Sequence, residues 1–202
     1  LHERLRCMAV KRTFLLETGR VLLKGATVLG LVALAACASG PPPATFDLTA
    51  PTGAIRGRPK GQFVVPAPLS LMIYDGDRIV VRQGGQVSVL KGAQWADRLP
   101  RLIQTRLIQT FENVGMTAGI GQPGERIAPD RQITLDIRAF EIDADRGEAV
   151  VEITVKLVRD ATGVVSASRV FSATEPAQAE PASAAAALDA ALSRVMVQIV
   201  AW

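Results

Sequence analysis

The residue types that most often carry chemistry are scarce in this sequence of 202 residues. The one histidine is His2, and the two cysteines are Cys7 and Cys37. If the chain is cleaved before Cys37, the mature protein keeps no histidine and one cysteine, at its first position. Such a chain cannot form a Ser–His–Asp or Cys–His catalytic group, a histidine-ligated zinc site or an intramolecular disulfide. Carboxylate chemistry remains, or no chemistry, and we expect no cofactor and no metal.

Two groups of carboxylates could do such chemistry. Glu141 and Asp143 are spaced like the paired carboxylates of a hydrolase, but on a strand they also fit a solvated face. Asp143, Asp145 and Glu148 surround Gly147 and suggest a calcium loop. The spacing lacks the third acidic position and the distal glutamate of that ligand set. We therefore predict a charged hairpin tip here, with no catalytic residue.

Residues 119–124 match the pattern G-x-G-x-x-G. In a dinucleotide site a helix must begin at the third glycine, so that its N-terminus can hold the pyrophosphate. Pro123 and Pro129 interrupt this region, and the next regular segment has the pattern of a strand. The sequence therefore predicts a loop between a helix and the sheet.

Three further residues are candidates for contact with a partner or with a lipid headgroup. Arg78 and Arg82 lie on the same face of a predicted strand, where they could bind a headgroup or a partner's carboxylate. A solvated strand face is the alternative. Trp95 stands at the start of a predicted helix, where it is either a core anchor or a platform on which a ligand stacks.

The distribution of charge excludes nucleic acid as a partner. The formal net charge of the chain is +4. Residues 1–36 hold six basic and two acidic residues, so the remaining 17 basic residues are balanced by 17 acidic ones. A neutral domain lacks the positive field that a phosphate backbone requires.

An export signal is predicted over residues 1–36. Met8, a second candidate for the start of translation, opens a basic stretch, and an apolar run over residues 25–36 follows it. A basic start, a short apolar centre and small residues before the cut are the parts of a secretory signal. The run is shorter than the roughly 20 residues that a membrane-spanning helix needs.

The signal ends in Leu-Ala-Ala-Cys37, which resembles the bacterial lipobox, whose cysteine is acylated and becomes the new N-terminus. The alternative is an ordinary signal peptide. We expect residues 37–45 to form the acylated cysteine and a flexible tether, and about nine residues from Cys37 to Phe46 reach roughly 28 Å. In this class of lipoprotein an uncharged residue after the cysteine, here Ala38, implies transfer to the outer membrane.

Residues 46–202 are predicted to form one α+β domain. Period-two patterns predict strands, including a hairpin around Gly84-Gly85 and a strand over residues 133–142 with a bulge near Ala139. Apolar residues at helical spacing predict helices from about residue 97 to 114 and over residues 181–202. We expect a two-layer sandwich: a mainly antiparallel sheet with two long amphipathic helices packed on one face.

Three segments resemble the ABC-type transport auxiliary lipoproteins, the family of paraquat-inducible protein C. They are residues 78–82 (Arg-Ile-Val-Val-Arg), residues 94–100 (Gln-Trp-Ala-Asp-Arg-Leu-Pro) and residues 136–141 (Asp-Ile-Arg-Ala-Phe-Glu). The resemblance extends from about Phe46 to Trp202, and the lipobox at Cys37 fits it. The Trp-Ala-Asp-x-Leu-Pro segment is its most specific part.

The resemblance implies a periplasmic lipoprotein, anchored in the outer membrane, that is a non-enzymatic component of an ABC-type lipid transport system. Its implied partners are a mammalian-cell-entry (MCE) domain protein with its permease and ATPase, and the lipid membrane through acylated Cys37. One alternative is a structural or assembly lipoprotein that partners an outer-membrane β-barrel. The other is a carboxylate hydrolase of the cell wall.

Overall fold

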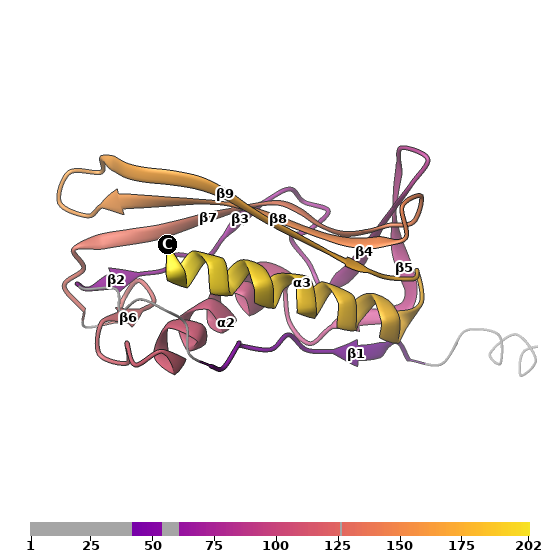
Figure 1. The fold of residues 1–202 in the computed structure, drawn as a ribbon, viewed down its shortest axis with the longest axis horizontal. Coiled ribbons are helices and arrows are strands. Elements are labelled where there is room, and N and C mark those ends of the chain that lie inside the picture. Colours follow the sequence, from indigo (N-terminus) through magenta and orange to yellow (C-terminus); the bar gives the residue numbers. More distant parts are fainter. Residues whose placement is uncertain (1–41, 54–60, 126) are drawn as a thin grey trace, which may run out of the picture. The chain divides into compact units, whose positions relative to one another are not determined.

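The long strand β7 (Arg131–Asp143) is the central strand of the sheet in the computed structural model (Figure 1). The structure describes residues 42–53, 61–125 and 127–202. The predicted signal over residues 1–36, Cys37 and the tether up to residue 41 lie outside the described residues. Residues 43–202 form one compact unit. Each edge of β7 is paired in a different way, and this difference determines the architecture.

One edge of β7 builds an antiparallel meander. β8 (Glu148–Arg159) pairs with β7 along its whole length, and β9 (Val165–Pro176) pairs with β8. The side chains of β8 alternate, and the four at positions 149, 151, 153 and 155 are completely buried. β8 therefore has one buried face and one face that is partly open to solvent.

Three short strands lie end to end along the other edge of β7, and all three are parallel to it. β2 (Phe63–Val64), β3 (Leu69–Ser70) and β4 (Arg78–Gln83) meet the start, the middle and the end of β7. The sheet is therefore mixed, and the prediction of a mainly antiparallel sheet is wrong in this respect. Pro66 and Pro68 separate β2 from β3 because proline has no amide hydrogen to donate to a neighbouring strand.

The predicted hairpin is confirmed as β4 and β5 (Gln86–Trp95), joined by Gly84 and Gly85 with φ of 54° and 77°. Positive φ at both turn positions is the geometry of a tight hairpin turn that glycine favours. β5 continues past Gly92, and its last three residues pair with β1 (Ala44–Phe46) at the edge of the sheet. β6 (Ile120–Gly121) pairs with β2.

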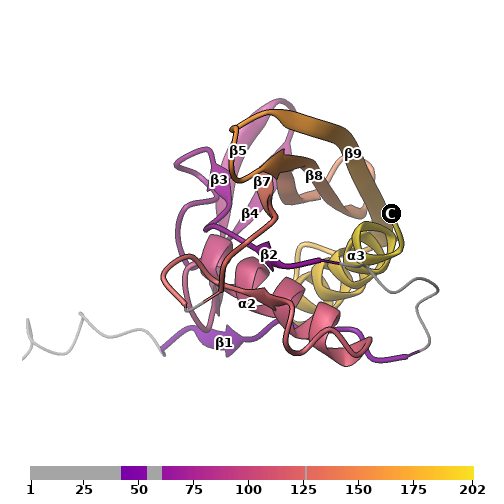
Figure 2. The same ribbon diagram turned by 90° about the vertical axis from the view of Figure 1, so that its left-hand side faces the viewer.

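The two helices differ in length and in environment. α3 (Pro181–Ala201) packs against β8 and β9, whereas α2 (Leu99–Asn113) packs against α3 and β6 (Figure 2). The prediction of two long helices on one sheet face is therefore wrong. α3 is long and apolar enough to cross a membrane, but 56% of its most apolar stretch is buried in the domain, as in a core helix.

The predicted bulge in β7 is also confirmed. The pairing of β7 with β8 shifts register between Ile137 and Ala139. Before the shift, Ile137 is buried, and after it Phe140 and Ile142 are buried, so both halves of the strand contribute to one core. The bulge therefore sets the face of β7 on which Glu141, between Phe140 and Ile142, lies.

Candidate interaction site

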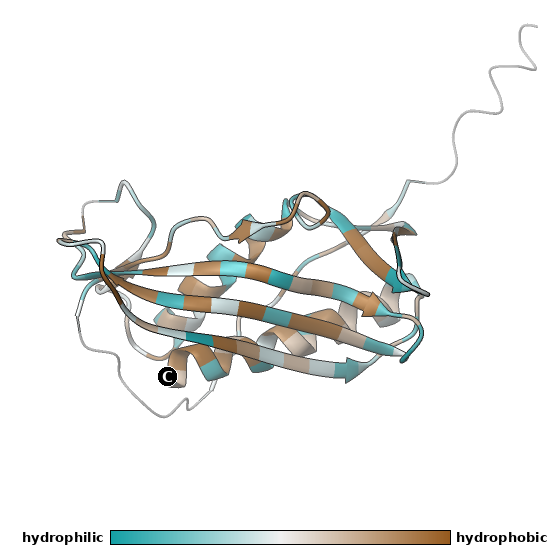
Figure 3. Cartoon of the chain, turned by 90° about the horizontal axis from the view of Figure 1, so that it is seen from above, coloured by the Kyte–Doolittle hydropathy of each residue, from teal (hydrophilic) through white to brown (hydrophobic). Residues whose placement is uncertain are grey.

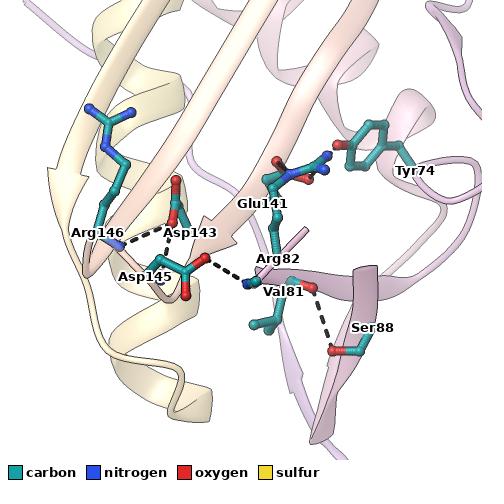
Figure 4. A network of polar contacts seen from close by, with 9 residues as sticks. Tyr74, Val81, Arg82, Ser88, Glu141, Asp143, Asp145 and Arg146 are labelled. Carbon is teal, nitrogen blue, oxygen red and sulfur yellow. Dashed lines mark hydrogen bonds and ion pairs between the residues drawn. The ribbon is translucent and has the colours of Figure 1, made fainter. Parts of the chain in front are cut away.

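A buried carboxylate lies where β4 meets β7. The Glu141 side chain is 7% exposed and accepts three hydrogen bonds (Figure 4). Tyr74 Oη donates to Oε2 at 2.6 Å, Arg82 Nε donates to Oε1 at 2.5 Å, and Arg82 Nη2 donates to Oε2 at 3.1 Å. Both carboxylate oxygens are therefore occupied, and we call these three residues the Glu141 network.

Sheet register brings the network together. Val80 is the parallel partner of Glu141, and Arg82, two residues further along β4, lies on the same strand face as Val80. Tyr74 comes from the segment between β3 and β4 and is 2% exposed. The network thus ties a connecting segment to the central strand of the sheet.

The electrostatics of the network favour an ion pair with a neutral phenol. Burial raises the pKa of Tyr74 to about 12, and the hydrogen bond to Glu141 adds to this effect. The carboxylate of Glu141 also raises the pKa of Arg82 above its ordinary value. At neutral pH, Tyr74 is therefore a hydrogen-bond donor and Arg82 is a cation.

The structure separates the two predicted contact arginines. Arg82 is 42% exposed but is engaged by Glu141, whereas Arg78 is exposed and forms no ion pair within the described residues. Val80, between them on the same face, is 1% exposed. The alternative of a solvated strand face fits the exposed Arg78, whereas the middle of this face is covered.

Trp95 belongs to the core. It is 1% exposed, and its ring lies edge-to-face with Phe140, with the two ring centroids 5.8 Å apart. The core-anchor interpretation is confirmed, and a ligand cannot stack on this ring as the domain stands. Trp95 Nε1 has no hydrogen-bond partner among the described residues.

The acidic residues around Gly147 form the predicted hairpin tip, between β7 and β8. Asp143 Oδ1 accepts hydrogen bonds from the backbone N–H groups of Asp145 and Arg146. Asp145 Oδ2 accepts one from the backbone N–H of Gly84, which links this tip to the β4–β5 hairpin (Figure 4). These carboxylates cap backbone amides, which is the ordinary use of aspartate in turns.

The G-x-G-x-x-G segment does not open a helix. Its second glycine, Gly121, lies in β6, and a Cβ added there would lie 2.1 Å from Glu125 Oε2. A Cβ added at Gly119 would lie 2.9 Å from the carbonyl oxygen of Gly61. These glycines allow close packing beside a short strand, which agrees with the expectation that the segment is not a dinucleotide site.

Sequence reasoning missed the most exposed apolar group among the described residues. Leu69, Leu71, Met72 and Ile73 are exposed by 71%, 66%, 91% and 39%, and we call them the apolar loop. A turn shapes it, with hydrogen bonds from Tyr74 N to Leu71 O at 2.9 Å and from Asp75 N to Met72 O at 3.2 Å. An uncharged apolar run directly after two prolines was the signal that could have found it.

Beside the apolar loop lies an open hollow of about 520 Å³, lined by residues 75–77 and 94–98. Residues 75–77 form one wall of the hollow, and the other wall includes the start of the Trp-Ala-Asp-x-Leu-Pro segment noted in the sequence. Trp95 N donates to Asp77 O at 2.6 Å and Leu99 N donates to Gly76 O at 2.8 Å, while Arg98 forms an ion pair with Asp75 at 2.6 Å. This segment therefore holds the end of the loop in place.

Comparison with known proteins identifies the family of the chain. The family model described as "ABC-type transport auxiliary lipoprotein component" matches residues 46–200. The uncharacterized protein bll6063 of Bradyrhizobium diazoefficiens is 32% identical over 162 residues, which are 78% of this chain and 44% of that protein. The chain thus spans less than half the length of this curated relative.

Solved structures share the fold. Protein XCC0632 of Xanthomonas campestris is 27% identical with a TM-score of 0.72, covering 79% of this chain and 93% of its own. A second solved structure, of an uncharacterized protein, is 14% identical with a TM-score of 0.59, covering 79% of this chain and 97% of its own. The second likeness concerns the fold alone.

Proposed function

Because the chain belongs to the family of ABC-type transport auxiliary lipoprotein components, we propose that it serves a lipid transporter built on an MCE-domain protein. In this proposal it is a periplasmic lipoprotein, anchored in the outer membrane through acylated Cys37, and it has no enzymatic activity. The single observation that carries the proposal is the family match over residues 46–200. Energy for transport comes from the permease and ATPase partners.

The arrangement of the carboxylates supports a non-enzymatic role. A general acid or base needs an oxygen that can reach the substrate and exchange a proton. Both oxygens of Glu141 are taken up by Tyr74 and Arg82, and the side chain is buried. Asp143 caps the hairpin tip. In this reading, the residues first considered for a hydrolase maintain the structure.

We place the docking surface for the MCE-domain partner on the solvated face of β7, β8 and β9. Figure 3 shows this face, on which polar and apolar residues alternate in front of α3. It carries the exposed Lys156 and the ion pair between Arg138 and Glu152, with an N–O distance of 3.0 Å. A mixed polar and apolar surface suits an interface that forms and dissociates.

The test is a pull-down of the tagged full chain from detergent-solubilised membranes, with mass spectrometry of the eluate. The wild type and Cys37→Ala are compared. We expect an MCE-domain protein and its permease with the wild type, and loss of outer-membrane localisation with Cys37→Ala. An eluate that holds a β-barrel protein alone would favour the assembly alternative, and an eluate without either partner would contradict the proposal.

A further inference from the structure

We propose that the apolar loop is a second membrane contact, which inserts into the leaflet that holds the acyl chains of Cys37. This inference rests on the lipid anchor of the proposed function. Met72 is 91% exposed and Leu71 is 66% exposed, next to Ile73 at 39%. Large apolar side chains gathered on one exposed loop mark a contact surface for a protein or a membrane.

The position of the chain's start favours the membrane. About seven residues join Cys37 to Ala44, the first residue of β1, and they span at most about 25 Å when fully extended. Acyl chains on Cys37 lie in the hydrocarbon region, whose polar covering is about 5–8 Å thick on each side. The start of β1 is therefore held close to the lipid surface.

The apolar loop lies on the same side of the domain as the start of β1. The end of β5 lies between them: Ala96 N donates to Phe46 O at 2.7 Å, and Trp95 N donates to Asp77 O at 2.6 Å. Two strand spacings, about 10 Å, therefore separate the backbone of Phe46, the last residue of β1, from that of Asp77, four residues after the apolar loop. In Figure 2 the segment after β3 and the start of β1 both lie on the left-hand side, the first near the top of the domain and the second near the bottom.

The loop is also built to hold its shape when it is exposed. Directly after Ile73, Tyr74 is buried and hydrogen-bonded to Glu141, and Asp75 is paired with Arg98. A loop that is fixed at its base loses little conformational freedom on contact, so apolar side chains at its tip bind more tightly than those on a free chain. The Glu141 network therefore acts as the support of the membrane contact.

The charge around the loop predicts a contact that depends little on salt. Charged groups of both signs lie beside it: Asp75, Asp77, Asp97 and Asp136, which is the backbone partner of Leu69, together with Arg78, Arg98 and Arg101. With no excess of positive charge, attraction to anionic headgroups is small, and burial of apolar surface drives the contact. The partner surface is a phospholipid bilayer, whatever the charge of its headgroups.

The test uses the full acylated chain in vesicles of phosphatidylethanolamine and phosphatidylglycerol. Once Cys37 is acylated and the signal is removed, Met72→Cys carries the one free thiol, to which an environment-sensitive fluorophore is attached. The matched control is Val164→Cys, because Val164 is 53% exposed and lies at the β8–β9 turn, near the start of β7. Both positions are exposed, so the label does not disturb the core.

We expect the label at position 72 to shift to shorter wavelength and to lose emission to quenchers placed in the acyl chains, while the label at 164 does neither. Equal behaviour of the two labels would overturn the membrane contact. A shift at 72 that rises with protein density and ignores the lipid quencher would assign the loop to a second copy of the chain and also overturn it.

Mass spectrometry of the mature N-terminus tests the proposed lipid anchor independently of the loop contact. A chain without acyl groups at Cys37 would refute the anchor, and with it the short tether on which the loop argument depends. An acylated chain whose label at position 72 stays in water would refute the loop contact alone. Repeating the experiment at raised salt should leave the shift at 72 unchanged.

Discussion

Replacement of Glu141 by glutamine tests whether the buried carboxylate is a structural residue. Glutamine keeps the shape of the side chain but removes its charge. Tyr74 loses an ionised acceptor, and one of the two hydrogen bonds from Arg82 to the carboxylate loses its acceptor. A hydrogen bond to a charged group contributes about 1.5–3 kcal/mol.

The expected loss of stability follows from the burial of the pair. Removing one partner of a fully buried ion pair costs about 3–5 kcal/mol. Arg82 is 42% exposed, so water compensates for part of its lost interaction. We therefore expect Glu141→Gln to lower the free energy of unfolding by about 2 kcal/mol, which lowers the midpoint temperature of a domain of this size by roughly 4–8 °C.

Urea titration with tryptophan fluorescence measures this loss, because Trp95 is buried and reports on the core. The matched control is Glu152→Gln, which breaks the ion pair with Arg138. In this pair the Glu152 side chain is 34% exposed and the Arg138 side chain is 51% exposed. Surface pairs of this kind contribute about 0–1 kcal/mol.

Equal stability of the two variants, both within about 0.5 kcal/mol of the wild type, would refute the structural role of Glu141. The carboxylate would then be free for chemistry. A cell-wall hydrolase that used Glu141 would lose its activity in Glu141→Gln while keeping its stability.

Three further predictions follow from the same contacts. Tyr74→Phe should destabilise the domain at neutral pH by about 1–2 kcal/mol. The pKa of Tyr74 is raised from 10.0 to about 12, so the hydroxyl stabilises the domain fully below pH 10 and loses this effect as the pH rises through 12. The denaturation curves of the wild type and of Tyr74→Phe should therefore converge between pH 10 and 12. Leu188→Ala, at a completely buried position of α3, should lower the free energy of unfolding by about 2–5 kcal/mol, as measured by urea titration. A loss below about 1 kcal/mol would contradict the packing of α3 on the sheet. Gly92→Ala places a Cβ on a residue with φ of 73°, where an L side chain strains the backbone even though no atom lies within 4 Å of the added Cβ. The free energy of unfolding should therefore fall by about 1–2 kcal/mol in thermal denaturation. An unchanged midpoint temperature would show that β5 tolerates strain at this bend.

Features that depend on neighbouring residues could be predicted from the sequence. Gly84-Gly85 favours a tight turn by its backbone conformation alone, and the hairpin is there. The change of apolar phase in residues 133–142 located the bulge, because side chains on a strand alternate with a period of exactly two. The two helices follow from apolar residues three and four positions apart.

Features that depend on distant pairing could not be predicted. No local pattern distinguishes a strand that pairs with its hairpin neighbour from one that lies parallel to a strand some 60 residues away, as β4 does on β7. The same pairing buries Glu141, which the alternation alone places on a solvated face. It also joins Tyr74 to Glu141 across 67 positions of the sequence.

The sequence by itself determined which residue types are at hand for chemistry, the positions of the helices and hairpins, and the motif that resembles the family. These properties reside in residue types and short-range spacing. Only the tertiary structure decided that Arg82 is engaged while Arg78 is free of an ion pair within the described residues, that Trp95 is in the core, and that the apolar loop is left exposed. Burial depends on which segments meet in space, and that depends on the pairing of the whole sheet around β7.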